Sequence, residues 1–232
     1  MVRYAVIHTV MPREFVLLQG KGCKWKQCTF CDYHTDVSAN PYAVNSEVLT
    51  SVTGVYGVLD VINSGSAMEL DEHTVEEIKR VVKEKNVHTL WFEAHYMYRH
   101  KLAKFAEQFE GVEVKFRCGI ESFDSALREQ WKKGVAADVT AENVAKYFQG
   151  VCLLCCTEGD SKERIIRDIA LAEQYFEYAS VNVFCENTTR VKRDENLTKW
   201  FVREVYPELI QSKKIEILIN NTDLGVGWST KK

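Results

Sequence analysis

Short apolar runs and longer amphipathic stretches alternate along this chain. The apolar runs are rich in β-branched and aromatic residues and predict strands at 15–18, 58–62, 89–93, 112–120, 151–156, 180–185 and 215–219. Between these runs, apolar positions recur with a helical period and predict helices at 44–52, 71–85, 100–109, 124–132, 142–148, 162–175 and 195–210. Each predicted strand is therefore followed by a helical segment until the last strand is reached.

This alternation predicts an α/β fold. Strands that are apolar throughout are typical of a parallel sheet whose faces are covered by helices. A closed eightfold barrel typically needs about 250 residues, whereas this chain has 232. We therefore expect an open, partial (β/α)6 barrel, built as a single domain over 1–232. Ligands of such folds bind at the carboxyl ends of the strands.

Charge and composition narrow the function classes. The net charge is −3 at pH 7, so the overall field does not favour nucleic acid or an anionic membrane. No basic segment followed by a long apolar run is visible at the amino terminus, and no apolar run reaches the length that spans a bilayer. We expect a cytoplasmic protein without a membrane or nucleic-acid partner.

Cysteine usage carries the first chemical signal. Eight cysteines in a reducing compartment do not predict a disulfide framework. Three of them, Cys23, Cys28 and Cys31, fall within nine residues after the first predicted strand. The others lie in apolar, strand-like surroundings, where free cysteine packs as a small apolar residue: Cys118, Cys152, Cys155, Cys156 and Cys185.

Three close thiolates fit two kinds of metal centre. They can hold three irons of a [4Fe–4S] cubane and leave the fourth iron open. A structural zinc site is the alternative, but zinc commonly takes four ligands from two pairs. No second Cys-x-x-Cys or His pair lies at finger spacing, although Cys155 and Cys156 or His34 could supply a distant fourth ligand.

The cysteine segment resembles the radical S-adenosylmethionine (SAM) superfamily. That family spaces its three cysteines by three residues and then two, with an aromatic residue before the last. Phe30 holds the aromatic position, but four residues separate Cys23 from Cys28. The resemblance implies a [4Fe–4S] cluster on Cys23, Cys28 and Cys31 and SAM at the open iron. It also implies an electron donor such as flavodoxin or ferredoxin, whose electron produces a 5′-deoxyadenosyl radical.

Three further segments carry the resemblance along the chain. The segment 64–69 stands where the family has a Gly-Gly-Glu segment that holds the SAM amino group. The ends of the fourth and fifth predicted strands stand where the family contacts the SAM ribose, carboxylate and adenine. The resemblance implies cofactor-binding roles for Ser64, Gly65, Ser66, Glu69, Arg117, Glu121, Ser122 and Cys156, together with Phe30. An ordinary turn, or solvated residues at a strand end, is the alternative for each segment.

The chain has no appended domain and no second cysteine cluster, which favours a small-molecule substrate. Within the superfamily, the sequence as a whole resembles the queuine lyase family. That resemblance implies hydrogen abstraction from queuine, a deazaguanine base, and cleavage of a C–N bond to give 7-aminomethyl-7-deazaguanine. A different radical SAM reaction, in cofactor or modified-base metabolism, and a non-catalytic metal-binding module are the competing hypotheses.

Candidate substrate contacts lie after the third, fifth and last predicted strands. We expect the terminal strand and tail, 212–232, to fold across the barrel mouth. In this tail the carboxylate of Asp223 could accept two hydrogen bonds from a guanine-like edge, although Asn221 and Asp223 could equally bond their own backbone. The substrate candidates are Asn221, Asp223, Glu93, Tyr98 and Glu158, and the catalytic candidates are Glu93, His95, Tyr96 and Cys155.

Overall fold

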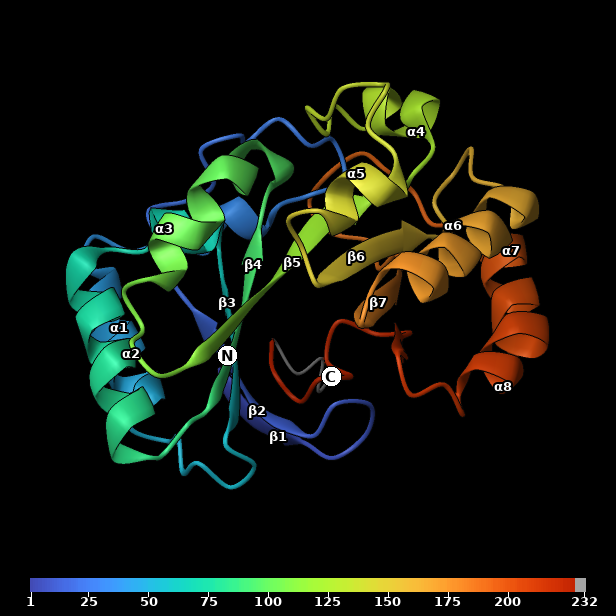
Figure 1. Ribbon diagram of the computed structural model, residues 1–232. Coiled ribbons are helices and arrows are strands. Elements are labelled where there is room, and N and C mark those ends of the chain that lie inside the picture. Colours follow the sequence, from blue (N-terminus) through green and yellow to red (C-terminus); the bar gives the residue numbers. More distant parts are fainter. Residues whose placement is uncertain (228–232) are drawn as a thin grey trace. The chain divides into compact units, whose positions relative to one another are not determined.

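The computed structural model describes residues 1–227 and divides the chain into two compact units (Figure 1). The first unit contains residues 1–26, 33–116 and 221–227, and the second contains residues 27–32 and 117–220. Both units are built from strands and helices that alternate along the chain, as the sequence predicts.

The sheet of the first unit follows chain order. It contains β1 (Tyr4–Ile7), β2 (Arg13–Leu18), β3 (Val58–Asn63) and β4 (Thr89–Ala94). β2 pairs in parallel with β3, and β3 with β4, whereas β1 runs antiparallel to β2 with Tyr4 opposite Val16. The sequence did not predict β1, because four residues at the edge of a sheet give too short a pattern.

Helices and short 3-10 turns connect these strands. They are η1 (Tyr33–Thr35), α1 (Pro41–Leu49), η2 (Ala67–Glu69), α2 (Glu72–Glu84), η3 (Tyr96–Lys101) and α3 (Leu102–Ala106). α1 begins earlier than predicted, at Pro41, since proline suits the first turn of a helix. Asp71 caps α2 by accepting the backbone N–H of Thr74 at 2.9 Å.

β5 (Glu113–Glu121) takes the chain from the first unit into the second. There β6 (Gly150–Cys155), β7 (Tyr178–Val183) and β8 (Ile215–Leu218) continue in parallel, in chain order. The helices of this unit are α4 (Ser125–Gln130), α5 (Ala141–Ala145), α6 (Lys162–Tyr175), α7 (Glu195–Trp200) and α8 (Tyr206–Leu209).

The single helix predicted at 195–210 is interrupted in the structure. A π turn, η4 (Phe201–Val205), lies between α7 and α8. Pro207 follows this turn, and a proline ring removes one helical hydrogen bond and crowds the preceding turn. The hydrophobic period continues through such a turn, so the sequence pattern did not reveal it.

Burial follows the predicted strands. The cysteines outside the motif are buried at Cys118, Cys152, Cys155 and Cys156, and only Cys185 is partly exposed. No helix within residues 1–227 is long and apolar enough to cross a membrane.

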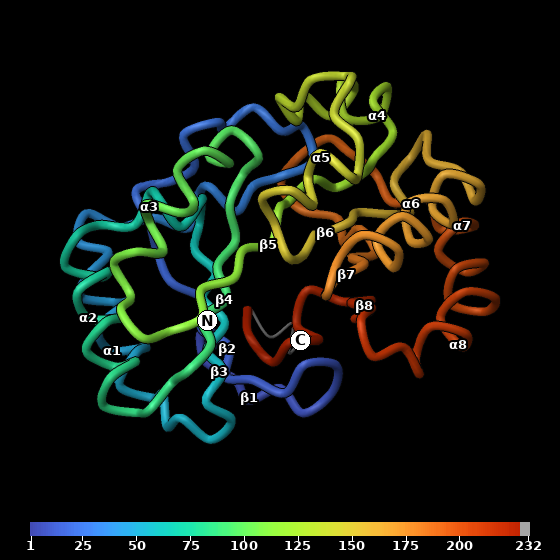
Figure 2. Tube along the Cα trace, in the orientation of Figure 1, coloured from blue at the N-terminus to red at the C-terminus, as the bar shows by residue number. Residues whose placement is uncertain are grey.

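The last described residues return to the first unit, where their trace lies near the amino terminus (Figure 2). Gly227 pairs with Val2, and Val226 packs against Ile7 and Phe15. Leu17 and Ile62 border the same apolar cluster. Because side chains alternate along a strand, Phe15 and Leu17 share one face of β2, opposite the face that carries Val16 and Leu18.

Candidate functional site

In the first unit, the loop after β2 brings Cys23 against the segment that follows β3. Cys23 is partly exposed and carries a free thiol. The Oγ of Ser64 accepts the N–H of Gly20 at 2.8 Å. A Cβ placed on Gly65 would lie 3.2 Å from both the Cα of Cys23 and the carbonyl oxygen of Gly22. Glycine at position 65 therefore allows close contact between the two loops.

Glu69 connects three parts of this region. Its carboxylate accepts the N–H of Ser66 at 2.9 Å, the N–H of Lys24 at 3.0 Å and the hydroxyl of Tyr98 at 2.7 Å. Burial, followed by this hydrogen bond to Glu69, raises the pKa of Tyr98 above its ordinary value. The structure thus brings Ser64, Gly65, Ser66 and Glu69 together beside Cys23, as the segment's position after the strand predicted.

The region after β4 adds His95 to this group. The backbone N–H of His95 donates to the Oγ of Ser66 at 3.0 Å, and its Nδ1 accepts the N–H of Met97 at 3.1 Å. In the neutral ring, the proton then resides on Nε2. The indole of Trp25 stacks on His95, with ring centroids 5.6 Å apart. Sequence reasoning missed Trp25, although its place two residues after Cys23 was a signal.

The other candidates near β4 differ in exposure. Glu93 is partly exposed, and strand alternation places it on the same face of β4 as Trp91. Tyr96 and Tyr98 are buried, and the guanidinium of Arg99 lies 4.7 Å from the ring centroid of Tyr96. Both tyrosines pack within the protein in this structure.

The tail presents Asn221 and Asp223 at the surface of the first unit. A turn in which the N–H of Gly225 donates to the carbonyl of Thr222 at 2.8 Å follows Asn221, and Val226 anchors it. The predicted tail extends to 232, and its last five residues, 228–232, lie outside the described part of the chain. Coverage of a barrel mouth by the tail stays a prediction.

In the second unit, Phe30 anchors the segment that carries Cys28 and Cys31. Its ring is buried, and its centroid lies 5.4 Å from that of Trp131 in an edge-on contact. Both cysteines pack against this apolar cluster, both are partly exposed, and neither forms a disulfide. The side-chain amide of Asn187 also donates to the carbonyl of Phe30 at 2.8 Å. Phe30 is therefore held through both its ring and its backbone.

Glu121 and Lys133 form an ion pair of 2.9 Å in the second unit. Glu121 ends β5 with a φ of +67°, a conformation that non-glycine residues seldom adopt and that is often found at functional sites. Lys133 also lies 5.7 Å from the ring centroid of Phe30. Burial alone would lower the pKa of Lys133, but Glu121 and Cys28 outweigh that effect and raise it.

A buried network holds the ends of β5 and β6. The hydroxyl of Ser122 donates to Asp168 at 2.6 Å, and Arg164 binds Asp168 at 3.0 Å. Arg164 also pairs with Asp160, whose carboxylate accepts the N–H of Cys156 at 2.8 Å. Cys156 adopts a φ of +64°. Ser122 and Cys156 are therefore fixed by a network that the sequence did not reveal.

Cys155 precedes this bend and is almost fully buried. Burial raises the pKa of its thiol, and the neighbouring thiol of Cys156 at 3.8 Å adds to that rise. Cys155 therefore stays protonated at neutral pH.

Arg117 does not lie with Glu121 and Ser122. It pairs in register with Gly150, the first residue of β6, and its guanidinium lies 5.8 Å from the ring centroid of Tyr178, the first residue of β7. Because β5 begins at Glu113, four residues before Arg117, Arg117 lies level with the amino ends of the neighbouring strands. Its role as a cofactor contact stays a prediction.

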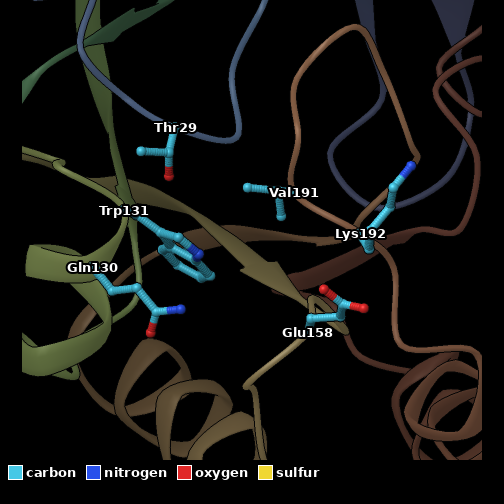
Figure 3. A pocket seen from close by; sticks show the side chains of 6 residues that line it. All are labelled: Thr29, Gln130, Trp131, Glu158, Val191 and Lys192. Carbon is cyan, nitrogen blue, oxygen red and sulfur yellow. The ribbon is translucent and has the colours of Figure 1, made fainter.

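Glu158 lines a pocket in the second unit (Figure 3). The other lining residues are Thr29, Gln130, Trp131, Val191 and Lys192. The N–H of Glu158 donates to the carbonyl of Lys192 at 2.8 Å, which fixes the segment while leaving the carboxylate exposed.

The metal-ligand assignment rests on donor chemistry. Within residues 1–227, no three His, Cys, Asp or Glu side chains form a ready metal-binding group. Cys23 belongs to the first unit, whereas Cys28 and Cys31 belong to the second. None of the three forms a disulfide, all three are partly exposed, and Gly65 approaches the backbone at Cys23 closely. This donor set fits an iron–sulfur cluster.

The chain is similar to a solved structure described as queuine lyase from Clostridium spiroforme bound to SAM and queuine. The two chains share 39% sequence identity with a TM-score of 0.92, over 98% of this chain and 99% of the other. No family model and no curated protein matches the chain.

The likeness confirms the predicted fold class, an α/β partial (β/α)6 barrel, and the predicted cofactors, SAM and a [4Fe–4S] cluster. Identity at this level over nearly the whole of both chains also identifies the protein as an enzyme with a small-molecule substrate. The chain belongs to the queuine lyase family of radical SAM enzymes.

Proposed function

We propose that this protein cleaves queuine. Hydrogen abstraction from queuine leads to cleavage of a C–N bond, which releases the cyclopentenediol part and yields 7-aminomethyl-7-deazaguanine. The observation that carries this proposal is the likeness to a queuine lyase bound to SAM and queuine, which covers 98% of this chain.

The cluster would be held by Cys23, Cys28 and Cys31, and with SAM it supplies the 5′-deoxyadenosyl radical. The protein's own contribution is to position SAM and queuine and to exclude side reactions. Phe30 supports this role by fixing the segment that carries Cys28 and Cys31 in an apolar cluster.

Two groups of residues would bind SAM. Backbone groups at Ser64, Gly65 and Ser66 lie beside Cys23, and Glu69 fixes their conformation through the N–H of Ser66. We assign them to the amino-acid end of SAM.

In the second unit, Glu121 and the backbone at Cys156 stand at the ends of β5 and β6. We assign Glu121 to the ribose and Cys156 to the adenine. Ser122 supports them through Asp168, so we propose a positioning role for it.

For the substrate, exposed and partly exposed groups are the better candidates. Asp223 and Asn221 are exposed, and a carboxylate can accept both hydrogen bonds from the 2-amino and N1 groups of a deazaguanine. We also propose Glu93 and Glu158 as substrate contacts. Tyr98 is buried on Glu69, which supports a positioning role instead.

Among the catalytic candidates, His95 contacts Ser66 and Trp25 and would orient the site. Cys155 carries a protonated thiol, which is a suitable hydrogen donor late in turnover. Tyr96 is buried and would act through packing.

We further propose how the chain is organised and that it works in the cytoplasm. We propose a single domain whose tail closes the barrel mouth, supported by the exposed Asn221 and Asp223 and the anchoring contact of Val226. One electron per radical would come from flavodoxin or ferredoxin in the cytoplasm.

The test compares wild type with Cys28→Ala after anaerobic reconstitution with iron and sulfide. Dithionite, SAM and queuine are added, and 5′-deoxyadenosine and deazaguanine products are measured by mass spectrometry. Cys185→Ala is the control, because Cys185 is a partly exposed cysteine outside the motif. We expect deoxyadenosine and 7-aminomethyl-7-deazaguanine from wild type and the control, and neither from Cys28→Ala.

Two other outcomes would contradict the proposal. Deoxyadenosine without the deazaguanine product would indicate a radical SAM reaction on another small molecule. A cluster-loaded wild type that forms neither product would favour a non-catalytic metal-binding module.

A further inference from the structure

The loop that carries Cys23 is strongly basic, although the chain as a whole is acidic. Residues 21–26 contain three lysines, Lys21, Lys24 and Lys26, and no acidic residue, whereas the net charge of the chain is −3. All three lysines are exposed. Within residues 1–227, none of them has an ion-pair partner. Their charges are therefore available to a partner.

A fourth lysine, Lys101, is linked to this loop through Tyr98 and Glu69. The Nζ of Lys101 lies 5.8 Å from the ring centroid of Tyr98, and the Tyr98 hydroxyl donates to Glu69. The same carboxylate accepts the N–H of Lys24 at 3.0 Å. Glu69 therefore connects η3 with the cysteine loop, and its negative charge is engaged by hydrogen bonds inside the protein.

Two apolar residues of the same unit, Trp25 and Met97, are linked through His95. Trp25 and Met97 both contact His95, Trp25 by ring stacking and Met97 through its backbone N–H. Trp25 is partly exposed, and Met97 is 39% exposed. Tryptophan and methionine are enriched at the centres of protein interfaces, while charged residues form the rim.

We infer that Lys21, Lys24, Lys26 and Lys101, with Trp25 and Met97, form the docking surface for a small acidic one-electron carrier of the flavodoxin class. The inference rests on the proposed function, since reductive cleavage of SAM consumes one electron per radical. In that step the flavin hydroquinone of the carrier would lose one electron and become a semiquinone, and that electron would reduce the cluster that Cys23, Cys28 and Cys31 would hold. Complementary charge would both speed encounter and orient the carrier toward Cys23.

The test uses full-length protein and a recombinant, net-acidic bacterial flavodoxin. Two triple variants change the loop, one to Gln and one to Glu at Lys21, Lys24 and Lys26. The control triple variant changes Lys83, Lys199 and Lys213 to Glu, which are exposed lysines outside the loop, so the change in net charge is the same. Binding of oxidised flavodoxin gives a Kd, and flavodoxin-driven deoxyadenosine formation gives an apparent KM for the carrier.

We expect the Glu variant to raise both the Kd and the apparent KM at least tenfold at low salt, with the Gln variant between it and wild type. The control should stay within twofold of wild type. Added salt should weaken flavodoxin binding to wild type more steeply than binding to the Gln variant, because the Gln variant has three fewer charges for salt to screen. Equal Kd and KM values in the loop variants and the control would overturn the inference.

Dithionite separates this inference from the proposed function. Product formation driven by dithionite should persist in the loop variants, because the small reductant needs no docking surface. If wild type makes no deazaguanine product with dithionite, the proposed function fails, whereas the flavodoxin Kd still tests the docking surface. A loop variant that loses its cluster would be recognised by its iron content and absorbance. In that case the flavodoxin Kd of the single variant Lys101→Glu tests the docking surface outside the loop.

Discussion

At the scale of single residues, the candidate site depends on Gly65, which has no side chain to keep the two loops apart, and on the carboxylate of Glu69. Gly65 brings the segment after β3 against Cys23, and Glu69 holds that segment through the N–H of Ser66. The residues of this segment could be predicted from their position after a strand. Lys133 could not be predicted, because its contacts with Glu121 and Phe30 join distant parts of the sequence.

Gly65→Ala should weaken SAM binding. The added methyl would lie 2.1 Å from Oε2 of Glu69 and 3.2 Å from the Cα of Cys23, so the carboxylate and the loop would have to move. We expect at least a tenfold weaker Kd for SAM, measured by calorimetry on reconstituted protein. Val55→Ala is the control, since the side chain of Val55 is 58% exposed. An unchanged Kd in Gly65→Ala would show that the two loops do not position SAM.

The raised pKa of Tyr4 makes the stability of the protein depend on pH in the alkaline range. Burial and then the hydrogen bond to Glu14, of 2.7 Å, raise the pKa of Tyr4 to about 12. A tyrosine in the unfolded chain ionises near pH 10. The folded protein thus retains a proton that the unfolded chain loses, so the stability from this contact is present below pH 10 and is lost as pH rises toward 12.

Tyr4→Phe should make the free energy of unfolding fall less steeply between pH 10 and 12 in urea titrations. Tyr42→Phe is the matched control, because Tyr42 is exposed and lacks such a carboxylate contact. The same slope in Tyr4→Phe and wild type would contradict this assignment.

At the scale of secondary-structure elements, long amphipathic stretches and apolar strands were predictable, whereas their ends and interruptions were not. α2 and α6 begin and end close to their predicted limits, since each has a capping residue and a clear hydrophobic period. The π turn between α7 and α8 and the edge strand β1 leave no comparable pattern. The bends at Glu121 and Cys156 depend on tertiary contacts and could not be deduced from propensity.

Asp168 should control how firmly α6 holds the ends of β5 and β6. It accepts hydrogen bonds from Ser122, the N–H of Phe123 and Arg164, and it is almost fully buried. Asp168→Ala removes one of the two carboxylates that pair with the buried guanidinium of Arg164. Loss of one partner of a buried ion pair typically costs about 3–5 kcal/mol of folding free energy. Urea unfolding of the reconstituted protein measures this loss.

Glu173→Ala on the same helix is the control for Asp168→Ala, because the acidic side chain of Glu173 is exposed, and a change below about 0.5 kcal/mol is expected. A similar small change in Asp168→Ala would mean that the network does not stabilise the strand ends.

At the scale of the whole molecule, the fold class and the cysteine motif were predictable, but the contacts between distant parts of the sequence were not. The α/β alternation indicated the partial barrel, and the likeness to a solved queuine lyase confirms it. The return of the tail to the first unit has no sequence signal, because apolar residues in 224–226 do not specify their partner.

Val226→Ala should destabilise the protein through this return contact. Val226 is 6% exposed and packs against Ile7 and Phe15. Removal of two buried methyl groups should lower the free energy of unfolding by about 1–2 kcal/mol. Val55→Ala, at a side chain that is 58% exposed, should change it by less than about 0.5 kcal/mol. Equal effects would show that the tail contact contributes no stability.

The order in which this chain leaves the ribosome follows from the same return contact. Ile7 and Phe15 emerge early, but Val226, which packs against them, emerges only after the whole second unit. At about 5–20 residues per second, the roughly 210 residues between Phe15 and Val226 take on the order of 10–40 s to synthesise. During that interval the apolar patch at Ile7 and Phe15 lacks its Val226 contact and remains open to chaperones.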